Sequence, residues 1–260
     1  MIKALFFDID GTLVSFKTHT IPQSTIDALI KAKEKGVKIF ISTGRPLPFI
    51  NNLQDINNLI DGYMTTNGGF CFIGDKVVSQ TPIPKEDVYK IIEFARIMDF
   101  SCVVVGEKDI AIYNYKEIVD EIFHRMLNVD YDFSKNSIED VLQQNILQIT
   151  PFITQTQEEE IMPILKGCFS ARWYPLFTDI TASNVNKGNA LIEMANYENI
   201  DIDETMALGD GGNDISIVQK AGVGVAMGNA GEELKKFANF ITSSVDEDGV
   251  MKALKHYNVI

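Results

Sequence analysis

Short apolar runs alternate with helical patterns at both ends of this 260-residue chain, and this alternation limits the possible folds most strongly. The expected strands cover residues 3–9, 37–42, 61–66, 205–210, 222–227 and 239–242. Helical patterns lie between them, including one that we expect to begin at Pro46. Strands that alternate with helices imply parallel βαβ units. The two ends therefore predict an α/β fold with a doubly wound parallel sheet.

The middle of the chain follows a different order. A helix expected after Pro84 precedes two closely spaced strands around Gly106, and two further strands meet across Pro175. Neighbouring hairpins indicate an antiparallel sheet, which we expect to carry helices on one face. We therefore predict a cap domain at residues 82–179, inserted into a catalytic core that is formed by residues 1–81 and 180–260.

Composition excludes several kinds of partner. The net charge is -13, which disfavours binding to nucleic acids and anionic lipids. The chain has no apolar run of the length that spans a membrane, and its first residues lack the pattern of a secretory signal. We expect a cytoplasmic protein without a nucleic-acid or membrane partner, either a monomer or a weak homo-oligomer. The three cysteines are too widely spaced to indicate disulfides or a zinc site.

The motif DIDGT carries two carboxylates at the end of the first strand. Asp8 and Asp10 are two residues apart, so the alternation of a strand places both on the same side. Gly11 allows the chain to leave the strand sharply. Ligands of open α/β sheets bind beyond the carboxyl ends of the strands, and two adjacent carboxylates favour Mg²⁺ as a compensating ion. The alternative is an ordinary polar loop.

Two further segments favour the binding of an anion. STGR at residues 42–45 places a hydroxyl and backbone N–H groups at a strand-to-helix turn, where phosphate binds readily. A plain helix cap is the alternative there. Lys187 opens a helix against the preference of the helix dipole, which favours a nearby anion, although a surface lysine would also fit.

The fourth segment, GDGGND at residues 209–214, again follows an expected strand. Asp210 and Asp214 add oxygen ligands at the same sheet edge, and Asn213 lies between them. Read alone, the segment would also fit a loop with a helix cap. The four segments together indicate a metal-assisted site for phosphoryl transfer.

In this order, DIDGT, STGR, Lys187 and GDGGND resemble the four motifs of the haloacid dehalogenase superfamily. Asp10 indicates the phosphatase branch. The TTNGG segment around Asn67, the late Lys187 and the inserted α/β region resemble the Cof-type sugar phosphatases, among them hexose-phosphate phosphatases. The likeness covers the whole chain, whereas the inserted region itself carries no specific motif.

The resemblance implies that Asp8 attacks phosphorus and becomes an aspartyl-phosphate, with Asp10 as general acid and base. Mg²⁺ would be held by Asp8, the backbone carbonyl of Asp10 and Asp210, with Asp214 in support. Thr43 and Lys187 would complete the catalytic set. The full set of expected phosphate or substrate contacts is Ile9, Gly11, Thr12, Thr43, Gly44, Arg45, Asn67, Arg172, Lys187 and Asn213.

The organic part of the substrate is the least determined point. A small phosphorylated metabolite, in particular a hexose phosphate, is the expected substrate. Arg172, Trp173 and Tyr174 are candidates for contacts with a sugar, although core packing would explain them as well. A phosphomutase or phosphotransferase would share Asp8 and the metal ion, and a catalytically silent metabolite-binding protein could share the fold.

Overall fold

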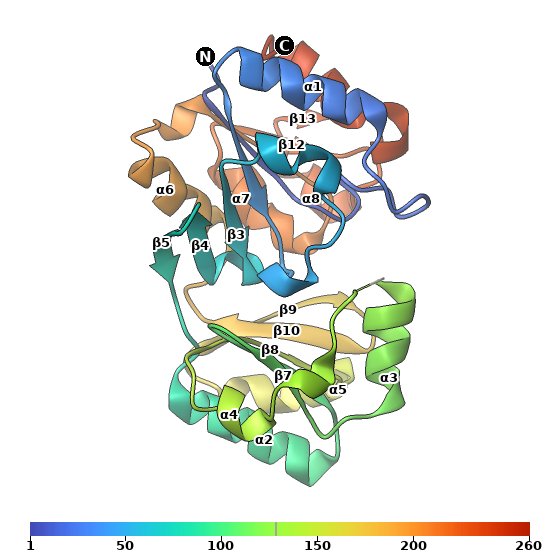
Figure 1. Ribbon diagram of the computed structural model, residues 1–260, viewed down its shortest axis with the longest axis vertical. Coiled ribbons are helices and arrows are strands. Elements are labelled where there is room, and N and C mark those ends of the chain that lie inside the picture. Colours follow the sequence, from blue (N-terminus) through green and yellow to red (C-terminus); the bar gives the residue numbers. More distant parts are fainter. Residues whose placement is uncertain (128) are drawn as a thin grey trace. The chain divides into compact units, whose positions relative to one another are not determined.

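The computed structural model describes residues 1–127 and 129–260, and of Trp173 it describes the backbone alone (Figure 1). The chain forms two compact units. The core unit consists of Met1–Gly44, Asn52–Ser79 and Asn186–Ile260. The insert unit consists of Arg45–Asn51 and Gln80–Val185.

The unit boundaries differ from the predicted ones for a packing reason. We placed the end of the insertion at residue 179, but strand β10 (Phe177–Ala182) pairs with two strands of the insert sheet and so extends that unit to Val185. Arg45–Asn51 joins the insert unit because Phe49 packs in one of its apolar clusters.

The core unit is built on a sheet with the strand order β13-β12-β11-β1-β2-β3-β4-β5. Its strands are β1 (Ala4–Phe7), β2 (Lys38–Ser42), β3 (Gly62–Thr65), β4 (Phe70–Ile73), β5 (Lys76–Gln80), β11 (Thr205–Gly209), β12 (Val223–Ala226) and β13 (Phe240–Ile241). Neighbours from β13 to β3 are parallel, whereas β4 runs antiparallel to β3. The predicted parallel sheet is confirmed; strands β4 and β5 were not predicted.

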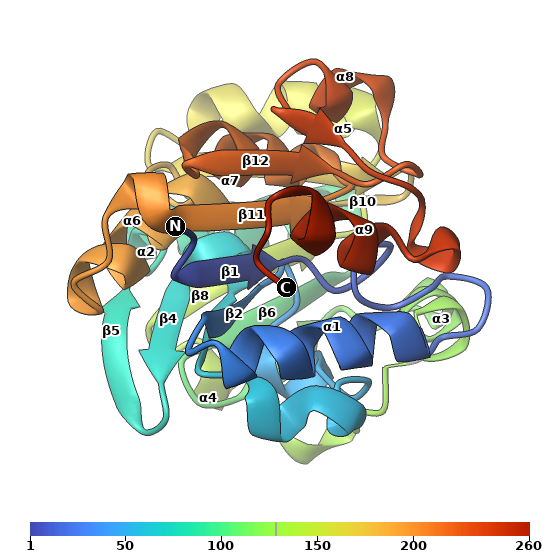
Figure 2. The ribbon, with the colours of Figure 1, turned by 90° about the horizontal axis from the view of Figure 1, so that it is seen from above.

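Helices cover both faces of this sheet. They are α1 (Gln23–Glu34), α6 (Lys187–Tyr197), α7 (Ile215–Lys220), α8 (Glu232–Lys235) and α9 (Gly249–His256). Phe6 stacks on Phe40 and joins an apolar cluster with residues of α6 and α7. The alternate residues Leu5 and Phe7 are also fully buried and point to the opposite face. Helix α1 contacts β2 and packs against α9 (Figure 2).

The insert unit contains a second sheet with the order β7-β6-β8-β10-β9, whose pairings are antiparallel, as predicted. Its other strands are β6 (Cys102–Gly106), β7 (Ile110–Tyr113), β8 (Ile146–Pro151) and β9 (Cys168–Tyr174). Its helices are α2 (Lys85–Met98), α3 (Glu117–Asp120), α4 (Ile138–Val141) and α5 (Gln155–Ile161).

The prediction that helices cover one face of the insert sheet is wrong. Cys102 and Val104 of β6 pack with residues of α2, α4 and α5. The alternate residues Val103 and Val105 point to the other face and pack with Val119 of α3 and with the π-helical segment Glu121–Met126 that follows it. The second apolar cluster exists because α3 and this segment present apolar side chains to the sheet.

The helix expected at Pro46 is also absent from the described residues. Two short 3₁₀ segments, Leu47–Phe49 and Gln54–Leu59, stand in its place. Pro46 and Pro48 remove two backbone donors from the first turn, which disfavours a regular α-helix there. In the part of the chain that the structure describes, no helix combines the length and apolar character needed to cross a membrane.

Candidate active site

The carboxyl ends of three parallel strands meet at the candidate site. Phe7 of β1 lies in register with Leu208 of β11 and with Ile41 of β2. Asp8, Asp210 and Thr43 each follow the last residue of one of these strands. Positions that are far apart in the sequence are thus brought to one sheet edge, as the parallel register requires.

The loop after β1 is wound tightly around one carbonyl group. The Ile9 carbonyl accepts hydrogen bonds from the N–H groups of Leu13 and Val14 at 3.0 and 2.8 Å. Gly11 has φ = 87°, in the left-handed region. A Cβ atom on Gly11 would lie 2.2 Å from Asp210 Oδ2, so only glycine leaves room for that carboxylate. The Ile9 side chain is buried, and Asp10 remains half-buried.

Lys187 is fully buried at the start of α6. Its Nζ donates hydrogen bonds to Asp8 Oδ1 and to Asp214 Oδ1, both at 2.6 Å. Burial by itself would lower the pKa of this lysine, but the charges of Asp214 and Asp8 outweigh that effect and raise the pKa above its usual 10.5. Lys187 therefore stays charged and ties the first motif to the fourth.

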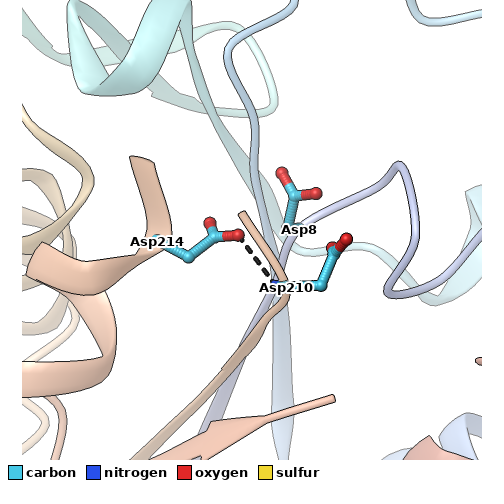
Figure 3. Close-up of side chains that lie close together, drawn as sticks. All are labelled: Asp8, Asp210 and Asp214. Atoms are coloured by element: carbon cyan, nitrogen blue, oxygen red, sulfur yellow. Dashed lines mark hydrogen bonds between the residues drawn. The ribbon is translucent and has the colours of Figure 1, made fainter. Parts of the chain in front are cut away.

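Asp8, Asp210 and Asp214 form an acidic cluster in which one oxygen from each lies within 4.8 Å of the others (Figure 3). Asp214 also braces the backbone, because its Oδ2 accepts hydrogen bonds from the N–H groups of Asp210 and Gly211 at 3.0 and 2.9 Å. Thr12 is fully buried and donates to Asp210 Oδ1 at 2.9 Å. Both Asp214 oxygens are thus engaged, which suits support better than direct ligation.

Burial is the main reason why the pKa of Asp8 rises from 3.8 to about 7, and the nearby charge of Asp214 adds to it. Burial and the charge of Asp8 likewise raise the pKa of Asp210 from 3.8 to about 8. Three carboxylates face one lysine, so the cluster carries excess negative charge. Carboxylate oxygens of this kind suit a hard divalent cation, and the residues fit a metal ion.

The second motif reaches the same edge through β2. Thr43 is 2% exposed, and its N–H donates to the Met64 carbonyl at 2.9 Å. The next expected contact, Asn67, donates its backbone N–H to the Thr43 carbonyl at 2.9 Å. Its side-chain Oδ1 accepts a hydrogen bond from Asn213 Nδ2 at 3.0 Å. Thr43, Asn67 and Asn213 are therefore connected, although they come from three separate segments.

Two expected contacts lie in the insert unit. Arg45 Nη1 donates to the Phe49 carbonyl at 2.9 Å, and Nη2 donates to the Leu127 carbonyl at 3.5 Å. Arg172 Nε donates to Glu158 Oε2 at 2.5 Å. The other two guanidinium nitrogens of Arg172 donate to backbone carbonyls of the same unit. Both arginines thus have structural partners within the insert.

The rest of the segment 172–174 is only partly described. The ring of Tyr174 stacks on Phe177 with centroids 5.4 Å apart, as core packing would predict. The side chain of Trp173, named above as a candidate for a sugar contact, lies outside the described part of the structure.

Sequence reasoning missed Asn229. Its Nδ2 donates to the Gly11 carbonyl at 2.9 Å, and its Oδ1 accepts from the Val245 N–H at 3.0 Å. It therefore links the loop after β1 to the C-terminal segment and lies 3.4 Å from Asp210 Oδ2. One signal was available: Asn229 closely follows the expected strand 222–227, at the same sheet edge as the motifs.

Comparisons with known proteins agree with this geometry. Residues 5–254 match the model of the haloacid dehalogenase-like hydrolases. The HAD subclass IIB sugar phosphatase BT4131 is 46% identical, with a TM-score of 0.94 over 99% of this chain and 100% of that one. BT1666 from Bacteroides thetaiotaomicron, described among HAD phosphatases, is 37% identical. Its TM-score is 0.89, and the match covers 100% of this chain and 96% of that one. Phosphatase YwpJ of Bacillus subtilis is 27% identical over 98% of this chain and 99% of its own length. The chain therefore belongs to the haloacid dehalogenase-like hydrolases, as a phosphatase of that family.

Proposed function

We propose that the protein is a Mg²⁺-dependent phosphomonoesterase that hydrolyses small phosphorylated metabolites, in particular sugar phosphates such as hexose phosphates. The observation that carries the proposal is the buried Lys187, which bridges Asp8 and Asp214 inside a cluster of three carboxylates. A cluster of this charge needs a cation before it can accept a phosphate dianion. The likeness to a sugar phosphatase over the whole chain supports the substrate class.

Asp8 acts as the nucleophile in this proposal. Its carboxylate attacks phosphorus in line, the bond from phosphorus to the leaving oxygen breaks, and Asp10 gives that oxygen a proton. Asp10 then removes a proton from water, whose oxygen attacks phosphorus. The bond to Asp8 breaks, which releases orthophosphate and restores the carboxylate. The buried carboxylate of Asp8, held by Lys187 at 2.6 Å, supports this role because its direction is fixed before substrate arrives.

Asp8, Asp210 and the backbone carbonyl of Asp10 would hold the metal ion, which when bound neutralises phosphoryl charge. Asp214 would keep Lys187 and the Asp210 backbone in place through its existing hydrogen bonds. Thr43, the Gly44 N–H and Lys187 would bind phosphoryl oxygens. None of these groups contacts the organic part of a substrate, so we assign the selection among substrates to the insert unit.

A panel of phosphorylated metabolites, assayed for phosphate release with and without Mg²⁺, tests the proposal. We expect release from several sugar phosphates, loss of the reaction after exhaustive chelation, and recovery when Mg²⁺ is returned. Full activity after chelation would refute the metal assignment. Formation of an isomeric phosphorylated sugar in place of orthophosphate would identify a phosphomutase. Absence of any turnover across the panel would favour a silent metabolite-binding protein.

A further inference from the structure

The loop after β1, residues 9–20, carries Asp10 and has two halves. The first half is the tight turn described above, in which Asp10 pairs with Val14 as an isolated parallel bridge. The second half, residues 16–20, is exposed, so burial does not hold it in place. The position of Asp10 therefore depends on what fixes the junction of the two halves, at Ser15.

Ser15 is buried at this junction and is the centre of its hydrogen bonds. Its N–H donates to the Thr20 carbonyl at 3.1 Å, and its carbonyl accepts from the His19 N–H at 2.9 Å. Its Oγ accepts from the Lys17 N–H at 3.0 Å and donates to Asp246 Oδ1 at 2.6 Å. The loop thus closes on itself at Ser15, and the hydroxyl joins it to a residue 231 positions further along the chain.

Asp246 lies in the 3₁₀ segment Val245–Glu247, which is anchored beside β12. Val245 is 4% exposed, and its N–H donates to Asn229 Oδ1 at 3.0 Å. The nearby Ser243 carbonyl accepts a backbone hydrogen bond at 3.0 Å from the turn after β12. Because the segment is fixed to the core sheet in this way, Asp246 offers the loop a hydrogen-bond acceptor in a fixed place.

The segment is tied to the loop at a second point through Asn229. This residue accepts a hydrogen bond from the segment and donates through Nδ2 to the Gly11 carbonyl at 2.9 Å. Gly11 directly follows Asp10, and Ser15 directly follows Val14, the bridge partner of Asp10. The two ties therefore hold the loop on both sides of the bridge. Asn229 also lies near Asp210, so Asp246 is the better residue with which to test the loop alone.

The two loop partners of Asp246 differ in exposure. Lys17 Nζ lies 2.8 Å from Asp246 Oδ2, but the side chain of Lys17 is 79% exposed, so this pair should contribute little. Ser15 is only 1% exposed, and a hydroxyl that donates to a carboxylate makes a short and strong bond. Hydrogen bonds from Lys17 and Ser15 lower the pKa of Asp246, which keeps the carboxylate ionised as an acceptor. We therefore expect Ser15 to carry the link.

We propose that Asp246 is a positioning residue, which acts through the hydroxyl of Ser15 to hold the loop after β1 so that Asp10 can carry out both of its proton transfers. The inference rests on the proposed phosphatase function and deepens it. In this role Asp246 touches neither the substrate nor a metal ion. Proton transfer requires hydrogen-bond distance, so a displacement of the loop by about 1 Å should remove much of the contribution of Asp10.

Two aryl phosphates with different leaving groups test this role. Phenolate is a poor leaving group that needs a proton from Asp10, whereas p-nitrophenolate leaves without one. The two esters differ only in the nitro group, so a selective effect on one of them reports on proton transfer. The ratio kcat/KM reports the transfer of the phosphoryl group to Asp8, because that step releases the alcohol.

In Asp246→Ala, kcat/KM should fall about ten-fold for phenyl phosphate and less than about two-fold for p-nitrophenyl phosphate. The kcat for p-nitrophenyl phosphate should still fall, because Asp10 also deprotonates the water that attacks the aspartyl-phosphate. Asp246→Asn keeps an acceptor for Ser15 and should retain most of the activity on both esters. Ser15→Ala should reproduce the pattern of Asp246→Ala.

Glu247→Ala is the matched control. Glu247 is the next residue of the same segment, and it accepts a hydrogen bond at 3.0 Å from Ser244 Oγ, at the start of that segment. The substitution removes an acid and a serine hydrogen bond but leaves the bond between Ser15 and Asp246 in place. Both kcat/KM values should stay unchanged. The midpoints of thermal unfolding of Glu247→Ala and Asp246→Ala should be similar, because both acids are exposed.

A double-mutant cycle tests whether Asp246 acts through Asp10. Asp10→Asn alone should show the same selective loss on phenyl phosphate, to a greater degree. When Asp246→Ala is added to it, kcat/KM should not fall further, because a residue that positions Asp10 then has no proton transfer left to support.

The outcomes separate this inference from the proposed function. If the unsubstituted protein turns over no phosphate ester, the proposed function is wrong, and the inference with it. If the protein does turn over phosphate esters, and Asp246→Ala lowers kcat/KM for the two aryl phosphates equally or for neither, only the inference is wrong. A further loss on phenyl phosphate when Asp246→Ala is added to Asp10→Asn would also overturn it.

Discussion

The core unit and the insert unit handle buried charge in opposite ways. In the core, Asp8, Asp210 and Asp214 share the charge of Lys187, and burial, together with the neighbouring carboxylate charges, raises the pKa values of Asp8 and Asp210. In the insert, Arg172 and Glu158 form a one-to-one pair at 2.5 Å, with both side chains mostly buried. The Arg172–Glu158 pair is neutral and needs no further counter-ion. The cluster has more carboxylates than cations, which favours the binding of a metal cation and of a ligand.

The largest expected effect concerns the nucleophile. Asp8→Asn should lower phosphatase activity by at least about a thousand-fold, because an amide cannot form the aspartyl-phosphate. The protein should still fold, as measured by circular dichroism and thermal unfolding. Steady-state turnover near the unsubstituted level, in a preparation shown by mass spectrometry to be free of deamidation, would contradict the assignment.

Removal of Lys187 should increase the excess negative charge of the carboxylate cluster. Lys187→Met leaves Asp8 and Asp214 without their buried partner, and breaking such a pair costs about 3–5 kcal/mol. We expect a clear drop in the midpoint of thermal unfolding and a loss of activity on all substrates. Lys236→Met is the control, since the Lys236 pair with Glu233 is largely exposed and should contribute little. Equal stability of the two variants would refute the buried role of Lys187.

Stability should also depend on pH when the metal ion is removed. In the unfolded chain Asp8 and Asp210 ionise near pH 3.8, but in the folded protein they keep their protons to about pH 7 and 8. Between pH 3.8 and about pH 8 the folded state binds more protons than the unfolded chain, so the free energy of unfolding should fall as the pH rises. From pH 6 to pH 8.5 this fall is on the order of 4 kcal/mol. Thermal unfolding in EDTA at pH 6 and pH 8.5 measures this, and Mg²⁺ should flatten the dependence. A midpoint in EDTA that is the same at both values would contradict it.

The smallest expected effect lies in the insert. Arg172→Met leaves Glu158 unpaired in that unit and should change the preference among sugar phosphates by a few-fold, while hydrolysis of p-nitrophenyl phosphate changes less than about two-fold. Arg125→Met is the control, because the Arg125 pair with Glu117 is exposed in the same unit. If the ranking of substrates does not move, selection by this part of the insert is wrong.

Local sequence patterns predicted the parallel part of the core sheet, although not strands β4 and β5. A strand buried on both faces is a continuous apolar run, and parallel strands bring their carboxyl ends to one edge. Asp8, Thr43 and Asp210 could therefore be assigned to a common site from local patterns alone. The same reasoning predicted the antiparallel sheet of the insert, since hairpins are local as well.

Long-range packing sets which side chains meet within and around that edge. The hydrogen bond between Asn67 and Asn213, the link made by Asn229, and the packing of Phe49 in the insert unit all join residues far apart in the chain. Periodicity reports which face of an element is buried, but not which distant side chain it meets there. Arg172 is a further example. The sequence placed it at a strand end, and only packing showed that its guanidinium already donates hydrogen bonds to Glu158 and to backbone carbonyls of the insert.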